Sequence, residues 1–97
     1  MQVQVSGDAA EFVRLRGGRL WVWAAYPRRC CAATPPLMHA AVREPPGVTG
    51  FRFVPGAGLE LSFRGLGDRQ PDMLEIGLRG RRRPRVEAYW DGCVLAM

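Results

Sequence analysis

The sequence predicts an α+β protein with one short N-terminal helix and about six or seven short, mostly antiparallel strands. Eight Pro and twelve Gly divide the 97 residues into short segments, which favours strands and turns over a helix bundle. Apolar residues follow a helical spacing only near the N-terminus, and most later segments alternate apolar with polar residues. The apolar share of 47% excludes a disordered chain. The length fits a single domain over residues 1–97 with a modest core.

The first two predicted elements are a short strand and the helix. Val3 and Val5 alternate with glutamines, as in a strand with one covered face. Ser6 can cap the N-terminus of a helix, and Asp8 places a negative charge in its first turn. Gly17-Gly18 should end this helix, because glycine adopts the left-handed conformation at low cost.

The middle of the chain carries the strongest strand signal, from Arg19 to Tyr26. Both of its faces are apolar, which predicts a central or doubly covered strand. One face would present Leu20, Val22, Ala24 and Tyr26, and the other Trp21, Trp23 and Ala25. The segment Leu37 to Glu44 lies between two proline pairs, which suits an extended segment better than a short helix.

The second half of the chain predicts four further strands. Phe51–Val54 and Leu59–Phe63 alternate and are joined by a Pro-Gly-Ala-Gly turn, which is typical of a hairpin. Met73 to Arg79 alternates again, with Leu74, Ile76 and Leu78 inward. After a turn at Gly80–Pro84, one face of the last strand carries Val86, Ala88 and Trp90.

Three cysteines form the first candidate site. Cys30 and Cys31 are adjacent in the loop after the strongest strand, and Cys93 lies near the C-terminal end. Thiolates are ligands for zinc, copper(I) and iron–sulfur clusters, and the neighbouring Arg28 and Arg29 would favour the thiolate form. The alternative is that these cysteines are small buried hydrophobes. The only histidine, His39, is either a further ligand or an ordinary strand residue.

A capped helix start at Val5–Ala10, the glycines and strand at Gly17–Val22, and then Cys30-Cys31 follow one another along the chain. This order resembles the front half of the HesB-like (A-type) iron–sulfur carrier proteins, and more specifically a small related group with a Cys-Cys motif, and as a pattern the likeness covers most of the chain. The resemblance implies that Cys30 or Cys31 matches the mid-chain ligand of an iron–sulfur cluster or single metal ion, and that Cys93 matches one tail ligand. The family's C-x-C-G tail is replaced here by Asp91-Gly92-Cys93. The resemblance also implies a homodimer, since A-type carriers share clusters between subunits.

A basic run near the C-terminus is the second candidate site. The net charge is +5, and all basic residues are arginine. The run comprises Arg79, Arg81, Arg82, Arg83 and Arg85, and it could bind phosphates or an acidic protein. An acidic protein is preferred to nucleic acid, because no recognisable nucleic-acid motif accompanies the run. The alternatives are a solvated hairpin turn and, for the arginine excess, GC-rich codon usage.

The leading hypothesis is a small cytoplasmic, cysteine-dependent protein that binds an iron–sulfur cluster or metal ion or performs thiol redox chemistry. The alternatives are a non-enzymatic basic binding domain and a structural subunit. His39 has no carboxylate nearby in the sequence except Glu44, so no Ser/His/Asp set can be built and enzyme activity is left open. A signal peptide and a membrane span are both absent from the pattern, which predicts a cytoplasmic protein with reduced thiols.

Overall fold

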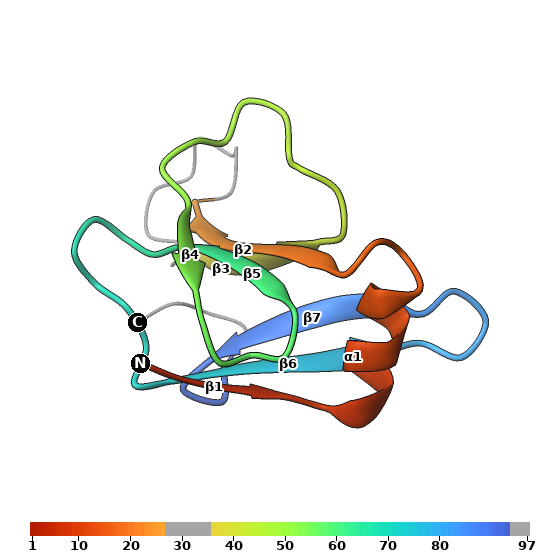
Figure 1. The fold of residues 1–97 in the computed structure, drawn as a ribbon. Helices are drawn as coiled ribbons and strands as arrows, with labels where there is room; N and C mark the ends of the chain where they lie inside the picture. The colour runs from red at the N-terminus through yellow and green to blue at the C-terminus, as the bar shows by residue number, and fades with distance from the viewer. Residues whose placement is uncertain (27–35, 94–97) are drawn as a thin grey trace.

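The computed structural model describes residues 1–26 and 36–93 and has a mostly β architecture (Figure 1). The elements are β1 (Gln2–Val5), α1 (Gly7–Arg14), β2 (Arg19–Ala25), β3 (Leu37–Ala41), β4 (Arg52–Val54), β5 (Glu60–Arg64), β6 (Met73–Arg79) and β7 (Arg85–Trp90). Of the described residues, 48% lie in strands or bridges and 10% in the helix. The predicted α+β class is therefore wrong. A helix of eight residues cannot form a layer of its own, so the sheets set the class.

The strands form two small sheets, where the sequence predicted one mostly antiparallel sheet. The first has the order β1-β6-β7 and the second the order β3-β2-β5-β4. β1 pairs with β6 in parallel, and β2 pairs with β5 in parallel. The other three pairings are antiparallel. Parallel pairing needs a crossover between strands that are distant in sequence, and the alternating pattern within each strand carries no information about such a partner.

The helix α1 begins and ends as the sequence predicted. The Ser6 side chain accepts a hydrogen bond from the Ala9 amide at 3.3 Å, which caps the first turn. Gly17 and Gly18 have φ values of 110° and 76°, and the Gly18 amide donates to the Val13 carbonyl oxygen at 2.9 Å. This glycine pair turns the chain out of the helix and directly into β2.

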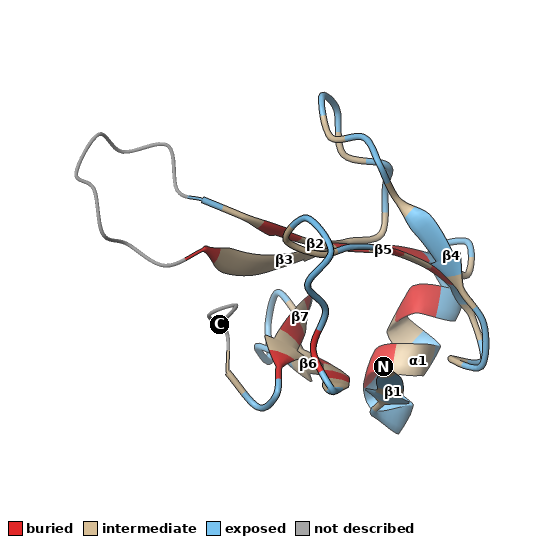
Figure 2. Ribbon diagram, turned by 90° about the vertical axis from the view of Figure 1, so that its left-hand side faces the viewer, coloured by how far each residue is buried: buried red, intermediate tan, exposed pale blue. Residues whose placement is uncertain are grey.

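The core lies between the two sheets (Figure 2). α1 packs against β6 and β2, while β3 packs against β7, so α1 and β3 cover different strands of the three-stranded sheet. The buried core residues are Ala9, Val13, Leu20, Val22, Ala24, Leu61, Phe63, Leu74, Ile76, Val86, Ala88 and Trp90. Leu78, which was predicted to point inward, is only partly buried against this core.

β2 is a central strand of the four-stranded sheet, as the sequence predicted, and its outer face is only partly covered. Trp21 and Trp23 on this face are half-buried. Tyr26, which was predicted on the opposite face, is 68% exposed because the strand ends at Ala25. The Trp23 ring stacks on His39 of β3 with ring centroids 5.3 Å apart, and Phe51 meets Trp23 edge-on. These aromatic contacts cover part of this face.

In the part of the chain that the structure describes, no helix has the length and apolar character needed to cross a membrane.

Candidate functional site

The thiol site can be placed only at Cys93. Cys30, Cys31 and the flanking Arg28 and Arg29 lie outside the described residues. Cys93 is a half-buried free thiol just after β7. Its amide donates to the Trp90 carbonyl oxygen at 3.0 Å, and the Trp90 amide donates to the Cys93 carbonyl oxygen at 2.6 Å. This pair of hydrogen bonds holds the Cys93 backbone against the end of the core.

The turn before Cys93 is also tied to the sheet. Asp91 has a φ of 49° and Gly92 a φ of 87°, so both occupy the left-handed region. Asp91 offsets this strain through its contacts with β6, because its amide donates to the Met73 carbonyl oxygen at 3.0 Å and its side chain accepts from the Met73 amide at 2.8 Å. The hydrogen bonds with Trp90 and Met73 therefore fix the position of the Cys93 backbone.

The end of β2 and the start of β3 lie toward the same end of β7 as Cys93. Leu37–Ala40 line one cavity with Arg85–Ala88, and Ala40–Arg43 line another with Pro84–Val86. β3 therefore starts near the later residues of β7 and runs toward its first residues. Its first residue is paired with the last residue of β2, so both strand ends lie toward the end of β7 that carries Cys93.

His39 is placed away from this thiol. It pairs with Trp23 across β2 and β3, and its ring stacks on that indole on the outer face of the four-stranded sheet. β7 packs on the opposite face, where Met38 and Ala40 contact the core. Within residues 1–26 and 36–93, no three His, Cys, Asp or Glu side chains are grouped closely enough to hold a metal ion.

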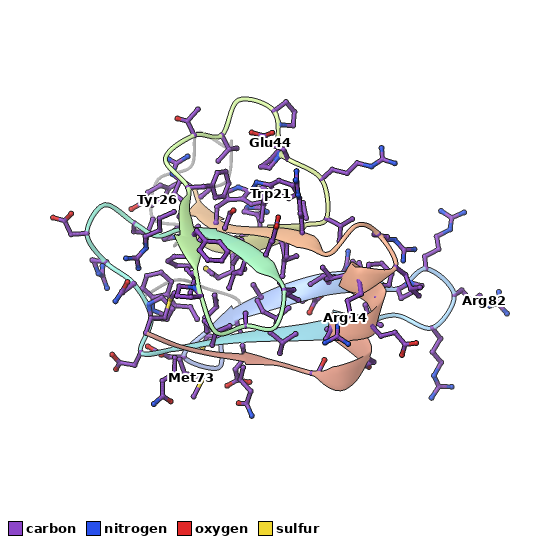
Figure 3. All side chains as sticks on the ribbon, in the orientation of Figure 1. Arg14, Trp21, Tyr26, Glu44, Met73 and Arg82 are labelled. Carbon is purple, nitrogen blue, oxygen red and sulfur yellow. The ribbon has the colours of Figure 1, made fainter. Side chains whose placement is uncertain are left out.

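The five arginines of the second candidate site are brought together on one hairpin. We call Arg79, Arg81, Arg82, Arg83 and Arg85 the basic hairpin; all five are exposed. Arg79 and Arg85 face each other in the β6–β7 register. Figure 3 shows Arg82 projecting from the loop between them, well away from the body of the protein. The whole sequence run therefore becomes one protruding surface.

Backbone requirements make this loop compact. Gly80 has a φ of 97°, and a Cβ there would lie 2.9 Å from the Arg83 carbonyl oxygen. Only glycine fits this close approach without a shift of the backbone. The three consecutive guanidinium groups that follow Gly80 are consequently held at the tip of the hairpin.

The arginines at the base and the tip of the hairpin differ in charge compensation. Glu87, with a side chain only 15% exposed, lies 3.7 Å from the Arg79 guanidinium and 3.5 Å from the Arg85 guanidinium. Glu87 also accepts a hydrogen bond of 2.7 Å from the Tyr89 hydroxyl, and this bond raises the pKa of Tyr89 above its usual value. Among the described residues, Arg81, Arg82 and Arg83 form no ion pair, so their charge is free to meet a partner.

An apolar groove adjoins the basic hairpin, and the sequence did not reveal it. The groove has a volume of about 370 Å³. It is lined by Phe12 of α1, residues 40–43 after and within β3, and residues 84–86 of β7 and its loop. Arg43 and Arg85 are the charged residues of its lining, and the Arg16 guanidinium lies 3.6 Å from the centroid of the Phe12 ring. Three separate segments build this groove, so no single motif could have announced it.

No family model matches the chain, and searches of curated proteins and of solved structures found no significant match. The resemblance to HesB-like carriers therefore stays a prediction from the residues that suggested it.

Proposed function

We propose that the protein is a non-enzymatic binding domain that docks an acidic segment of another protein on the basic hairpin and the adjacent groove. The observation that carries this proposal is the uncompensated charge of Arg81, Arg82 and Arg83 at the tip of a hairpin whose base, Pro84 and Arg85, lines an apolar groove. The guanidinium groups would attract and orient carboxylates. The groove would take an apolar side chain of the same segment, which supplies the affinity that exposed ion pairs lack.

The groove also favours a protein partner over nucleic acid. Its lining is mainly aliphatic, with Val42, Pro84 and Val86 among its residues. A single-stranded nucleic acid would need a basic track together with exposed aromatic rings for stacking. The one aromatic ring in the groove, Phe12, is half-buried and already has the Arg16 guanidinium over its face. An acidic peptide with a leucine or similar anchor complements both the charge and the apolar surface.

A fluorescent peptide of glutamates around a central leucine tests the proposal by anisotropy. We expect binding that weakens with salt, because exposed charges are screened. Three exposed ion pairs contribute about 0.2–1 kcal/mol each, so the triple variant with glutamine at Arg81, Arg82 and Arg83 should bind about tenfold more weakly. A charge-matched control replaces Arg52, Arg64 and Arg69 with glutamine and should bind as the parent does.

The anchor is tested in the peptide, where protein folding is not at risk. Replacing its leucine by serine should also weaken binding about tenfold, because a buried leucine side chain contributes about 1.5–3 kcal/mol. Equal weakening by both triple variants would show a response to net charge alone and would refute the proposed surface. Tighter binding of single-stranded DNA than of the peptide would equally contradict it.

A second candidate is the cysteine-dependent function, with the homodimer and the cytoplasmic location that accompany it. Cys93 follows the end of β7, and the end of β2 and the start of β3 lie toward that same end. This placement supports the second candidate. Cys30, Cys31 and Cys93 would then be the ligands of a cluster or metal ion, or the redox thiols, with Arg28 and Arg29 keeping the first two ionised.

Anaerobic reconstitution with iron and sulfide tests this second candidate. We expect visible-range absorption that Cys93→Ser removes, or zinc retained in proportion to protein and lost in the same variant. No chromophore, no retained zinc and ordinary thiol reactivity would exclude it. Because the peptide assay does not depend on the thiols, the two candidate functions fail independently.

A further inference from the structure

A second group of arginines lines a cavity at the other end of the molecule from the basic hairpin. Arg52 lies on β4, Arg64 ends β5 and Arg69 belongs to the following loop. Together with nearby glycines they line a cavity of about 300 Å³. In Figure 1 the loop after β5 and the loop between β6 and β7 project at opposite ends of the fold. This cavity is therefore separate from the proposed peptide surface.

The loop that closes the cavity is built by a close backbone approach. The Leu66 amide donates to the Arg69 carbonyl oxygen at 3.2 Å, and the Arg69 amide donates to the Leu66 carbonyl oxygen at 2.8 Å. A Cβ on Gly65 would lie 2.1 Å from that same Arg69 oxygen. Because Gly65 has no side chain, the loop folds back and returns the Arg69 side chain to the edge of β5.

The Arg52 guanidinium is positioned on two sides. It donates a hydrogen bond to the Gln70 side-chain oxygen, and it lies 5.9 Å from the centroid of the Phe63 ring. Phe63 is 1% exposed and belongs to the core, so the arginine rests on a fixed part of the structure. A guanidinium held in this way loses less conformational entropy when it binds a ligand.

The charge in the cavity is mostly uncompensated. Within residues 1–26 and 36–93, Arg52, Arg64 and Arg69 form no ion pair. Asp68 is the one acidic residue in the lining. Guanidinium groups match the geometry of phosphate oxygens and bind them through paired hydrogen bonds. A phosphate ester carries about −1.5 to −2 charges near neutral pH, which is close to the excess positive charge of this cavity.

We infer that this cavity binds a phosphate group, either inorganic phosphate or the phosphate of a small phosphomonoester. The volume lies near the lower end of the range for small-molecule sites, about 300–1,000 Å³. It accommodates a phosphate with a few further atoms. Arg52, Arg64 and Arg69 bind the phosphate oxygens, and the Gln70 side chain keeps Arg52 in place.

Amide chemical shifts of the ¹⁵N-labelled protein test this inference during titration with phosphate and, separately, with glycerol phosphate. Ionic strength is held constant with chloride. We expect saturable shifts at Gly50 and at residues 65–70 in the millimolar range or tighter. A phosphomonoester that binds more than about tenfold tighter than phosphate would identify the organic ester as the ligand, and phosphate that binds more than about tenfold tighter than the ester would identify inorganic phosphate.

Variants separate this cavity from the basic hairpin. Arg64→Gln should weaken phosphate binding at least about tenfold, because it removes a charged hydrogen-bond donor from the site. Arg64→Lys keeps the charge but not the paired donors, and it should give an intermediate affinity. The triple glutamine variant of Arg81, Arg82 and Arg83 should bind phosphate as the parent does. Since Arg64 is exposed, the far-UV circular dichroism spectra of both Arg64 variants should match that of the parent.

Two results would overturn the inference. One is the absence of saturable shifts at residues 65–70 at phosphate concentrations of tens of millimolar, well above a millimolar dissociation constant. The other is binding that survives Arg64→Gln unchanged but is lost in the triple variant of the hairpin, which would place the phosphate on the hairpin surface.

Discussion

Replacing Gly65 with alanine tests whether the loop between β5 and β6 is closed by backbone contact. The new methyl would lie 2.1 Å from the Arg69 carbonyl oxygen and 3.3 Å from Cε1 of Phe63. Contacts between such atoms are favourable only near 3.5–4.0 Å, so the loop would have to move by about 1 Å or more. Neither neighbour can yield easily, because one is backbone and the other is a buried ring.

The cost of this movement can be worked from the contacts that it breaks. Forcing an extra methyl into a packed site costs about 1–3 kcal/mol. Loss of the two hydrogen bonds between Leu66 and Arg69 adds about 0.5–1.5 kcal/mol each if they are not replaced. We expect a loss of about 2 kcal/mol or more. For a domain of this size that corresponds to a fall in the unfolding temperature of about 8–16 °C.

Thermal unfolding followed by circular dichroism measures the effect. Gly7→Ala is the matched control, because nothing lies within 4 Å of a Cβ at that position. Gly7 is the first residue of α1, so alanine there should leave stability unchanged or raise it by up to about 1 kcal/mol. If Gly65→Ala unfolds at the parent temperature, the tight loop and the arginine cavity that it closes are not as described.

Three further predictions concern hydrogen-bonded side chains. Ser6→Ala removes the cap of α1 and should lower the free energy of unfolding by about 1 kcal/mol in urea denaturation. The hydrogen bond from the Ser6 hydroxyl holds the pKa of Asp8 below its usual value of 3.8. The ionised Asp8 carboxylate therefore stabilises the fold above that pH, and this contribution is lost as the pH falls through the folded-state pKa. The parent and Asp8→Asn should converge in stability at low pH. The hydrogen bond from Tyr89 to Glu87 raises the pKa of Tyr89 above 10.0, so its contribution is present below that pH and lost as the pH rises further, and Glu87→Gln should lower the pKa of Tyr89 in an absorbance titration. Unchanged values in these variants would contradict the corresponding bonds.

The local elements could be predicted because short-range signals decide them. Ser6 and Gly17-Gly18 set the limits of α1, and the hairpin of β4 and β5 follows from two alternating segments around a glycine-rich turn. In the last hairpin, Gly80 and the buried face of β7 agree in the same way. Each of these signals lies within about ten residues of chain.

The arrangement of the sheets could not be predicted in this way. Leu74 and Ile76 alternate with more exposed residues whether the neighbour of β6 is parallel or antiparallel. The pairing of β1 with β6 joins residues about seventy positions apart, and nothing in either segment names the other. The predicted fold class is wrong for a related reason. It counts the short helix as a layer, whereas the two layers of the structure are its two sheets.

The candidate sites divide along the same line. The basic hairpin is one sequence run, so its existence could be predicted from the run itself. The apolar groove combines Phe12, Val42 and Val86 from three elements, and the arginine cavity combines residues 52, 64 and 69. In both, the residues are distant in sequence and form no motif, so the site exists only in the folded chain. The joining of Cys30 and Cys31 with Cys93 stays a prediction.

Amide chemical shifts of the ¹⁵N-labelled protein during titration with the acidic leucine peptide test the proposed binding surface most directly. We expect the largest changes at Phe12, residues 40–43 and residues 79–86, which form the groove and the basic hairpin. Changes at the arginines alone would show attraction of charge without a seated apolar anchor. Changes confined to the outer face around Trp21 and Trp23, or no saturable change at all, would contradict the proposed docking surface.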